Sequence, residues 1–126
     1  MIRQGSLIGY LRENHPDILV EAKSKLLSSP TSRTVFSQMH SRARKIVQDD
    51  WQVKLVTITA ALLYSSPETL YSAMPIRNGV AKTLGCVLDV TKQAVSKKLD
   101  QARHYYTHVA WCRDAVDKIV REVRGE

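Results

Sequence analysis

Residues 79–99 read GVAKTLGCVLDVTKQAVSKKL, and this stretch predicts two helices joined by a tight turn. We expect Asp89 at the turn, because Asp is tolerated in backbone geometry that most residues avoid. The hydroxyl of Thr91 is expected to cap the second helix. Gly85 is expected to give one helix close access to the other. The apolar positions that would pack the two helices together are Leu84, Leu88, Val90, Val95 and Leu99.

The turn has a second possible position. Residues 81–85, AKTLG, are also typical of the end of a first helix. The turn would then lie near Gly85, with residues 86–89 as an irregular insert. We favour the turn at Asp89, because Val90 and Val95 then keep the spacing that the two-helix unit needs.

Residues 88–99 carry a resemblance to a known family. They read LDVTKQAVSKKL, and the segment resembles the helix-turn-helix units of bacterial regulators, whose pattern there is roughly Leu-Gly-Val-Ser/Thr-x-x-x-Val-Ser-x-x-Leu. The family usually has Gly where this chain has Asp89. The resemblance covers about twenty of the 126 residues, and it implies that the recognition helix begins at Thr91.

The second helix has side chains suited to DNA. With Val95 and Leu99 facing the core, Gln93 is placed to bond adenine, and Lys92 or Lys97 to reach guanine or phosphate. The predicted contacts on this helix are Thr91, Lys92, Gln93, Ser96 and Lys97, and the flanking cations expected to hold the DNA backbone are Arg77, Lys82, Lys98 and Arg103. Residues 77–103 contain six basic and two acidic side chains, whereas residues 105–126 contain four of each. The positive charge is therefore concentrated on the two-helix unit.

The composition is that of a single globular domain. The chain has 126 residues, of which 44% are hydrophobic and 25% charged, and its net charge is +7. Such a charge favours a polyanionic partner. We expect no membrane span and no signal peptide, and hence a cytoplasmic, nucleoid-associated protein. Cys86 and Cys112 are expected to be buried, unpaired thiols.

Residues 1–75 predict a helical bundle. Helices are expected at about 6–14, from Asp17 onward, across residues 35–47, and from Trp51 to Tyr64 with Asp50 as a cap. The last of these is apolar on most sides, which is typical of a central helix. Pro67 is expected at the first position of a short helical turn.

A second basic cluster lies within residues 33–45. Arg42, Arg44 and Lys45 have no acidic neighbour in it, and they either add DNA-backbone contacts or form a solvated helix face.

The C-terminal part predicts a long helix. Apolar residues recur every three or four positions from Val95 to Val123, and the recognition helix is expected to continue into a C-terminal helix, with a possible break near residues 105–107. Nothing there is typical of a β-hairpin wing. The stripe would be covered by the N-terminal bundle or by a second copy of the chain, and we favour a homodimer with Trp111 at its interface. The expected fold is thus all-α, a single compact domain with a bundle (1–75), a helix-turn-helix (77–104) and a C-terminal helix (105–126).

No catalytic constellation, cofactor motif or small-molecule site is evident. His104 and His108 stand four apart but lack a further ligand, so we expect no metal site. The sequence therefore favours a non-enzymatic, sequence-specific protein for double-stranded DNA, acting as a dimeric transcriptional regulator such as a repressor, or as a plasmid or phage site-binding factor. The alternatives are a helical protein-interaction module and a weakly specific nucleic-acid packaging protein.

Overall fold

The most apolar stretch of the chain forms the central helix, α4 (Asp50–Ser65). From Val53 to Leu62 almost every side chain is buried, including two threonines. Their hydroxyls donate hydrogen bonds of 2.7 Å to helix carbonyls, Thr57 to Val53 and Thr59 to Leu55. These bonds satisfy the hydroxyl donors, so that α4 can lie in the middle of an apolar core.

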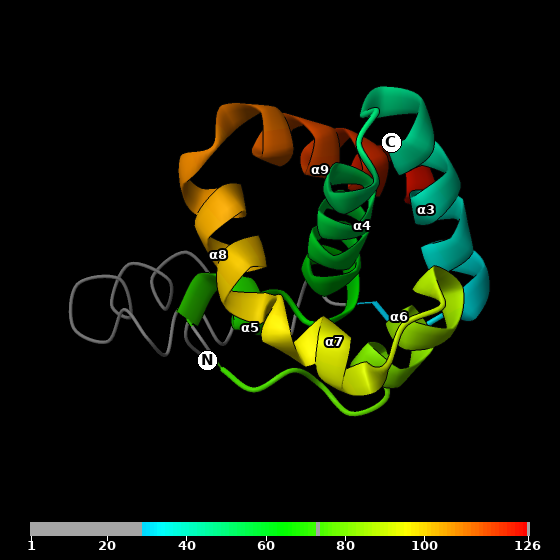
Figure 1. The fold of residues 1–126 in the computed structure, drawn as a ribbon, viewed down its shortest axis with the longest axis vertical. Coiled ribbons are helices and arrows are strands. Elements are labelled where there is room, and N and C mark those ends of the chain that lie inside the picture. Colours follow the sequence, from blue (N-terminus) through cyan, green and yellow to red (C-terminus); the bar gives the residue numbers. More distant parts are fainter. Residues whose placement is uncertain (1–28, 73, 126) are drawn as a thin grey trace, which may run out of the picture.

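Most of the other described helices pack on α4 (Figure 1). The computed structural model describes residues 29–72 and 74–125, and this part of the chain is helical without any strand. The helices described besides α4 are α3 (Arg33–Ile46), α5 (Pro67–Ser72), α6 (Val80–Leu88), α7 (Lys92–Lys97), α8 (Leu99–His108) and α9 (Ala110–Val123). Of these, α7 packs mainly on α6 and α8. The predicted all-α fold is confirmed. The helices expected near residues 6–14 and from Asp17 lie outside the described residues.

The helix starts largely follow the sequence signals. Ser32 caps α3, where its hydroxyl accepts a hydrogen bond from the backbone N–H of Val35 at 3.3 Å. Pro67 occupies the first position of α5, as predicted. The cap of α4 is Asp49, whereas the sequence reading placed it at Asp50. Asp49 and Asp50 are adjacent, and Asp is a favourable cap at either position, so the sequence alone does not show which of the two caps the helix.

The prediction that the recognition helix continues unbroken into the C-terminal helix is wrong, and the break considered near residues 105–107 lies at Val109. The chain breaks at Lys98 and again at Val109, which has extended backbone angles (φ −114°, ψ 108°). A straight helix over residues 99–123 would be about 37 Å long, far beyond the bundle. The break at Val109 instead turns α9 back to pack on α3 and α4.

The apolar stripe is covered by the protein's own bundle. Ala102, Cys112, Val116 and Ile119 are each fully buried. Between α8 and α9, the hydroxyl of Tyr106 donates a 2.8 Å hydrogen bond to the carboxylate of Asp117. The stripe therefore needs no second copy of the chain to cover it.

The cysteines differ from each other. Both are free thiols, but Cys112 is buried on α9, while Cys86 is exposed on α6. The expectation that both are buried is therefore wrong for Cys86. Burial raises the pKa of the Cys112 thiol to about 11.

Candidate nucleic-acid interface

A sharp turn at Asp89 joins α6 to α7. Asp89 has left-handed backbone angles (φ 55°, ψ 47°), and no other non-glycine residue in the described part of the chain has a positive φ. Asp is among the residues that tolerate this conformation. Directly after it, the N–H of Val90 donates to the carbonyl of Gly85 at 2.9 Å. The turn thus lies at Asp89 and not at Gly85.

Gly85 lies inside α6, where it allows the turn to pack closely against the helix. It is buried, and a Cβ built on it would lie 2.7 Å from the carbonyl oxygen of Val90. No real side chain tolerates that contact without a backbone shift. The absence of a side chain at Gly85 is what lets the turn fold back against α6.

The start of α7 is fixed on both its polar and its apolar sides. The hydroxyl of Thr91 accepts a hydrogen bond from the N–H of Ala94 at 3.0 Å, which confirms the predicted cap. Val95 is fully buried, and Leu84 and Leu88 of α6 are buried with it. Val90 and Leu99 pack partly buried against the same core. The two-helix geometry expected for residues 79–99 is present, up to the break at Lys98.

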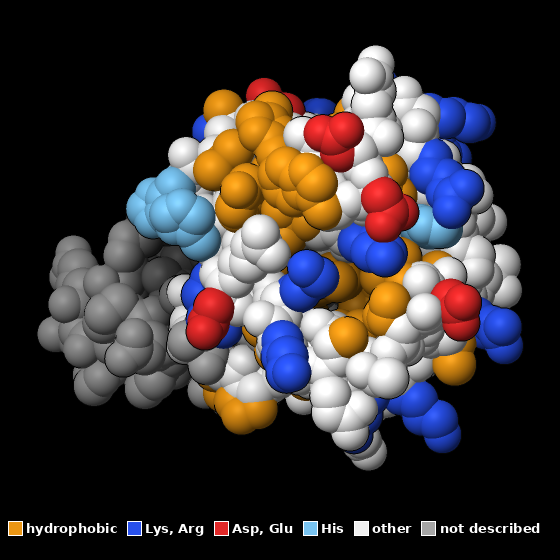
Figure 2. Space-filling view, viewed as in Figure 1, with side chains coloured by type: hydrophobic (Ala, Val, Ile, Leu, Met, Phe, Trp, Pro, Cys, Tyr) orange, Lys and Arg blue, Asp and Glu red, His pale blue; other side chains and the backbone are white. Residues whose placement is uncertain are grey.

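The opposite side of α7 is open to solvent. The predicted contact residues that are exposed on or beside this helix are Thr91, Lys92, Gln93, Ser96, Lys97 and, on α6, Lys82. Figure 2 shows Lys and Arg side chains on the surface over α7 and α8 in the view of Figure 1. These exposed side chains include three lysines, two on α7 and one on the neighbouring α6.

Two of the predicted flanking cations are bound within the protein. The guanidinium of Arg77 pairs with the carboxylate of Glu68, whose side chain is only 9% exposed. Arg103 donates from Nε to the carbonyl of Thr69 at 2.9 Å and from Nη1 to Asp100 at 2.7 Å. These contacts join α8 and the loop before α6 to α5. The third, Lys98, is half-buried at the break between α7 and α8.

Buried Glu68 was not predicted as a structural residue. Its only sequence signal was its place after Pro67, which is also typical of an ordinary exposed helix start. The pairing with Arg77, nine residues away, depends on how the loop after α5 folds back.

The basic residues of α3 separate into two groups. Arg42 pairs with Glu122 of α9, and Lys45 lies beside the same helix pair. Arg44 is exposed elsewhere on α3, close to His40. Burial lowers the pKa of His40, and the charge of Arg44 lowers it further.

A cluster of aromatic rings is exposed where α4, α8 and α9 meet. Trp51, Tyr105 and Trp111 make pairwise edge contacts, with ring centroids 6.0–6.2 Å apart. Trp51 is 44% exposed and Trp111 38%. Figure 2 shows an apolar patch over the junction of α8 and α9. We call these three side chains the aromatic patch.

Next to this patch, His104 and His108 are exposed, and their rings lie 5.1 Å apart. Within residues 29–72 and 74–125, no three side chains of the types that ligate metals come together. The pair thus has no third ligand among the described residues.

Comparisons with models of known protein families, with curated proteins and with solved structures gave no match. The resemblance to bacterial regulators therefore depends on residues 88–99 alone. None of the described helices is long and apolar enough to cross a membrane.

Proposed function

We propose that this protein binds double-stranded DNA in a sequence-specific manner, with α6, the turn at Asp89 and α7 acting as a helix-turn-helix. The observation that carries the proposal is that one side of α7 is buried in the core and the opposite side is exposed and polar. Val95 holds one side in the core with no exposed surface, while Lys92, Gln93 and Lys97 are exposed on the other. A helix fixed in this way presents polar side chains in a constant geometry.

The chemistry of the exposed side fits base edges and phosphates. α7 has six residues and is about 9 Å long, and the major groove is about 12 Å wide. Gln93 would bond adenine, and Lys92 or Lys97 would bond guanine or phosphate. Lys82, exposed on α6, and the hydroxyl of Ser96 would contact the backbone, which supplies position and most of the charge-dependent affinity. The protein would act by occupying its site, as a non-enzymatic regulator or a plasmid or phage site-binding factor.

We further propose a homodimer, formed through the aromatic patch. Large apolar side chains are depleted from free surfaces and enriched where proteins meet. The patch includes Tyr105 of α8, the helix that directly follows α7. A twofold axis beside the patch would therefore place two recognition helices on one palindromic site.

The DNA proposal is tested by fluorescence anisotropy with a random duplex pool, at about 50 and about 200 mM salt. The variant is Gln93→Ala with Lys97→Ala. The matched control is Gln48→Ala with Arg113→Ala, which removes one exposed amide and one exposed cation away from α7. We expect wild type and control to enrich a sequence that the α7 variant ignores. The α7 variant should lose about 10- to 100-fold in affinity for that sequence.

Equal binding by all three proteins without enrichment would contradict the proposal. No affinity for DNA, together with a salt-insensitive affinity for a protein, would favour the protein-interaction module instead. For the dimer, we expect wild type to sediment as two protomers on a palindromic duplex, and Trp111→Ser to sediment as one protomer on a duplex with a single half-site. A wild-type protein that stays monomeric on an enriched palindrome would refute it.

A further inference from the structure

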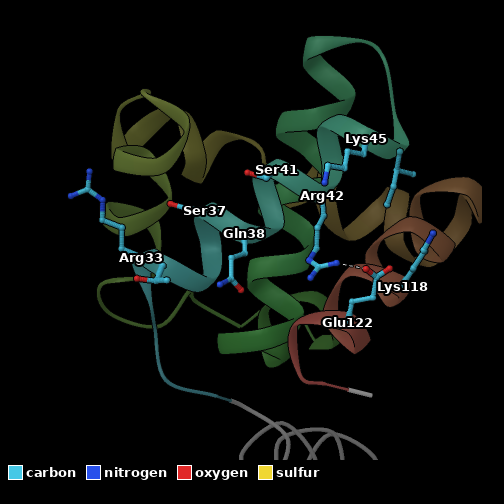
Figure 3. Close-up of a pocket in the computed structure, with 10 residues that line it drawn as sticks. Arg33, Ser37, Gln38, Ser41, Arg42, Lys45, Lys118 and Glu122 are labelled. Carbon is cyan, nitrogen blue, oxygen red and sulfur yellow. Dashed lines mark hydrogen bonds and ion pairs between the residues drawn. The ribbon is translucent and has the colours of Figure 1, made fainter.

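An elongated groove runs between α3 and α9 (Figure 3). Its volume is about 720 Å³, and it is lined from one end of α3 to the other, from Arg33 to Ile46. Four successive turns of α3 contribute side chains, and Lys118 and Glu122 contribute from α9. The α3 side of the groove is a helix of 14 residues, about 20 Å long, whereas the α9 side is one turn, from Lys118 to Glu122.

The groove is strongly basic. Four cations line it, Arg33, Arg42, Lys45 and Lys118, against the single carboxylate of Glu122. Glu122 is paired with Arg42. Arg33, Lys45 and Lys118 form no ion pair with any residue that the structure describes. Between the charges lie small hydrogen-bonding side chains, among them Ser37 and Ser41.

The shape and the lining residues of the groove indicate which kind of anion it would bind. Each nucleotide of a DNA strand carries one negative charge, so a row of cations along α3 can contact successive phosphates of one strand. No aromatic ring lines it, and Ile46 at one end is the apolar exception. Bases are held by stacking on rings, which this groove does not offer. A ligand here is recognised through repeated phosphates and not through a base.

The groove and α7 have no residue in common. In Figure 1, α7 lies below α4, and the C-terminal part of α9 passes behind α3. In Figure 3 the groove is seen with α3 and α9 toward the viewer and α4 behind them. A duplex held by the side chains of α7 would therefore not use the side chains that line the groove.

We infer that the groove between α3 and α9 binds the phosphate backbone of a second DNA duplex, so that one protein molecule bridges two duplexes. The inference extends the proposed function, in which α7 holds the first duplex. The groove is non-selective for sequence, whereas α7 is selective. The protein thus brings any DNA segment to its specific site.

The test is a bridging assay with the full chain. A duplex carrying the sequence enriched by wild type (or a random duplex, if none is enriched) is immobilised on beads, and capture of a fluorescent random duplex is measured. The groove variant is Lys45→Gln with Lys118→Gln. Its control is Arg113→Gln with Arg121→Gln, which removes the same charge from exposed positions outside the groove. A third protein has the α7 substitutions Gln93→Ala and Lys97→Ala.

We expect the groove variant to lose capture of the second duplex and to keep selective binding of the first. The slope of log affinity against log salt for the second duplex should fall by about 1.8, about 0.9 for each cation removed. The control should capture it like wild type. Capture by the groove variant equal to wild type, or single-duplex binding by wild type without capture, would overturn the inference and leave the α7 proposal intact. Salt-dependent DNA binding that is unchanged in the α7 variant but lost in the groove variant would refute the α7 proposal alone.

Discussion

Replacing Gly85 with alanine tests the geometry that connects α6 to α7. In a helix interior, Ala is more favourable than Gly by about 1 kcal/mol. The added Cβ, however, would lie 2.7 Å from the carbonyl oxygen of Val90 and 3.5 Å from the backbone nitrogen of Lys92. Because the crowded atoms are backbone, the turn must move as a whole. Such overpacking costs about 1–3 kcal/mol, so the central expectation is a net loss of about 1 kcal/mol in the free energy of unfolding.

The assay is urea unfolding followed by circular dichroism, with Cys86→Ala as the matched control. Cys86 follows Gly85 in the same helix but is exposed, so its replacement gains helix propensity without a new contact. We expect Cys86→Ala to be neutral or stabilising by about 0.5 kcal/mol. The melting temperature of Gly85→Ala should fall by about 4 °C.

A stability of Gly85→Ala equal to or above that of wild type would refute this reasoning. It would mean that the turn at Asp89 is not pressed against α6 in solution. An unchanged m-value is required for the comparison, because it shows that both proteins expose the same surface on unfolding. If the proposed function is correct, the shifted turn also reduces DNA affinity by more than the loss of stability explains.

Three further predictions concern the same region and the core. Glu68→Ala should lower the free energy of unfolding by about 2 kcal/mol in urea titrations, because the partly exposed Arg77 guanidinium loses its buried partner; a loss below 0.5 kcal/mol, within what a surface change gives, would contradict the pairing. Thr91→Ala should cost about 1 kcal/mol while Thr91→Ser costs less, because only alanine removes the capping oxygen; equal costs would argue against the cap. Burial raises the pKa of Cys112 from its ordinary 9.0 to about 11, so the folded protein favours the neutral thiol. The contribution of this group to the free energy of unfolding is therefore fully present below pH 9.0 and is lost as the pH rises to about 11. Cys112→Ala should flatten the stability curve there, and near pH 8 a thiol reagent should modify Cys86 rapidly and Cys112 only on unfolding; rapid modification of both would contradict this.

The unit formed by α6 and α7 could be predicted because its signals are local. Asp89 tolerates the left-handed turn, Thr91 caps the next helix, and Val95 lies one turn further on the buried side. Each of these depends only on the backbone within a few residues. From the sequence, only the spacing of Val90 and Val95 favoured a turn at Asp89 over one at Gly85. The 2.9 Å hydrogen bond from the N–H of Val90 to the carbonyl of Gly85 shows that the turn at Asp89 is correct.

The positions at which the helix ends after α7 could not be predicted, because a regular repeat of apolar residues does not show where a helix stops. A repeat of three and four residues is continuous through Val109, although the helix stops there. The break is favoured by what α9 contacts after it, and those partners, α3 and α4, are distant in sequence. The groove between α3 and α9 follows from that same break. Its basic residues on α3 were visible in the sequence, but Lys118 and Glu122 were not linked to them.

The cations predicted from the sequence to contact DNA thus form two groups: those that make contacts within the protein and those that are exposed. Arg77 and Arg103 are held by Glu68 and by the carbonyl of Thr69, whereas Lys92 and Lys97 point to solvent. If the proposed function is correct, a substitution at Arg77 or Arg103 would lower DNA affinity even if neither touched DNA, because the contacts that join α5 to the loop before α6 and to α8 would be lost. A loss of binding there is evidence for a contact only if stability is unchanged. For Lys92 and Lys97 no such correction is needed, so α7 alone gives a direct test of recognition.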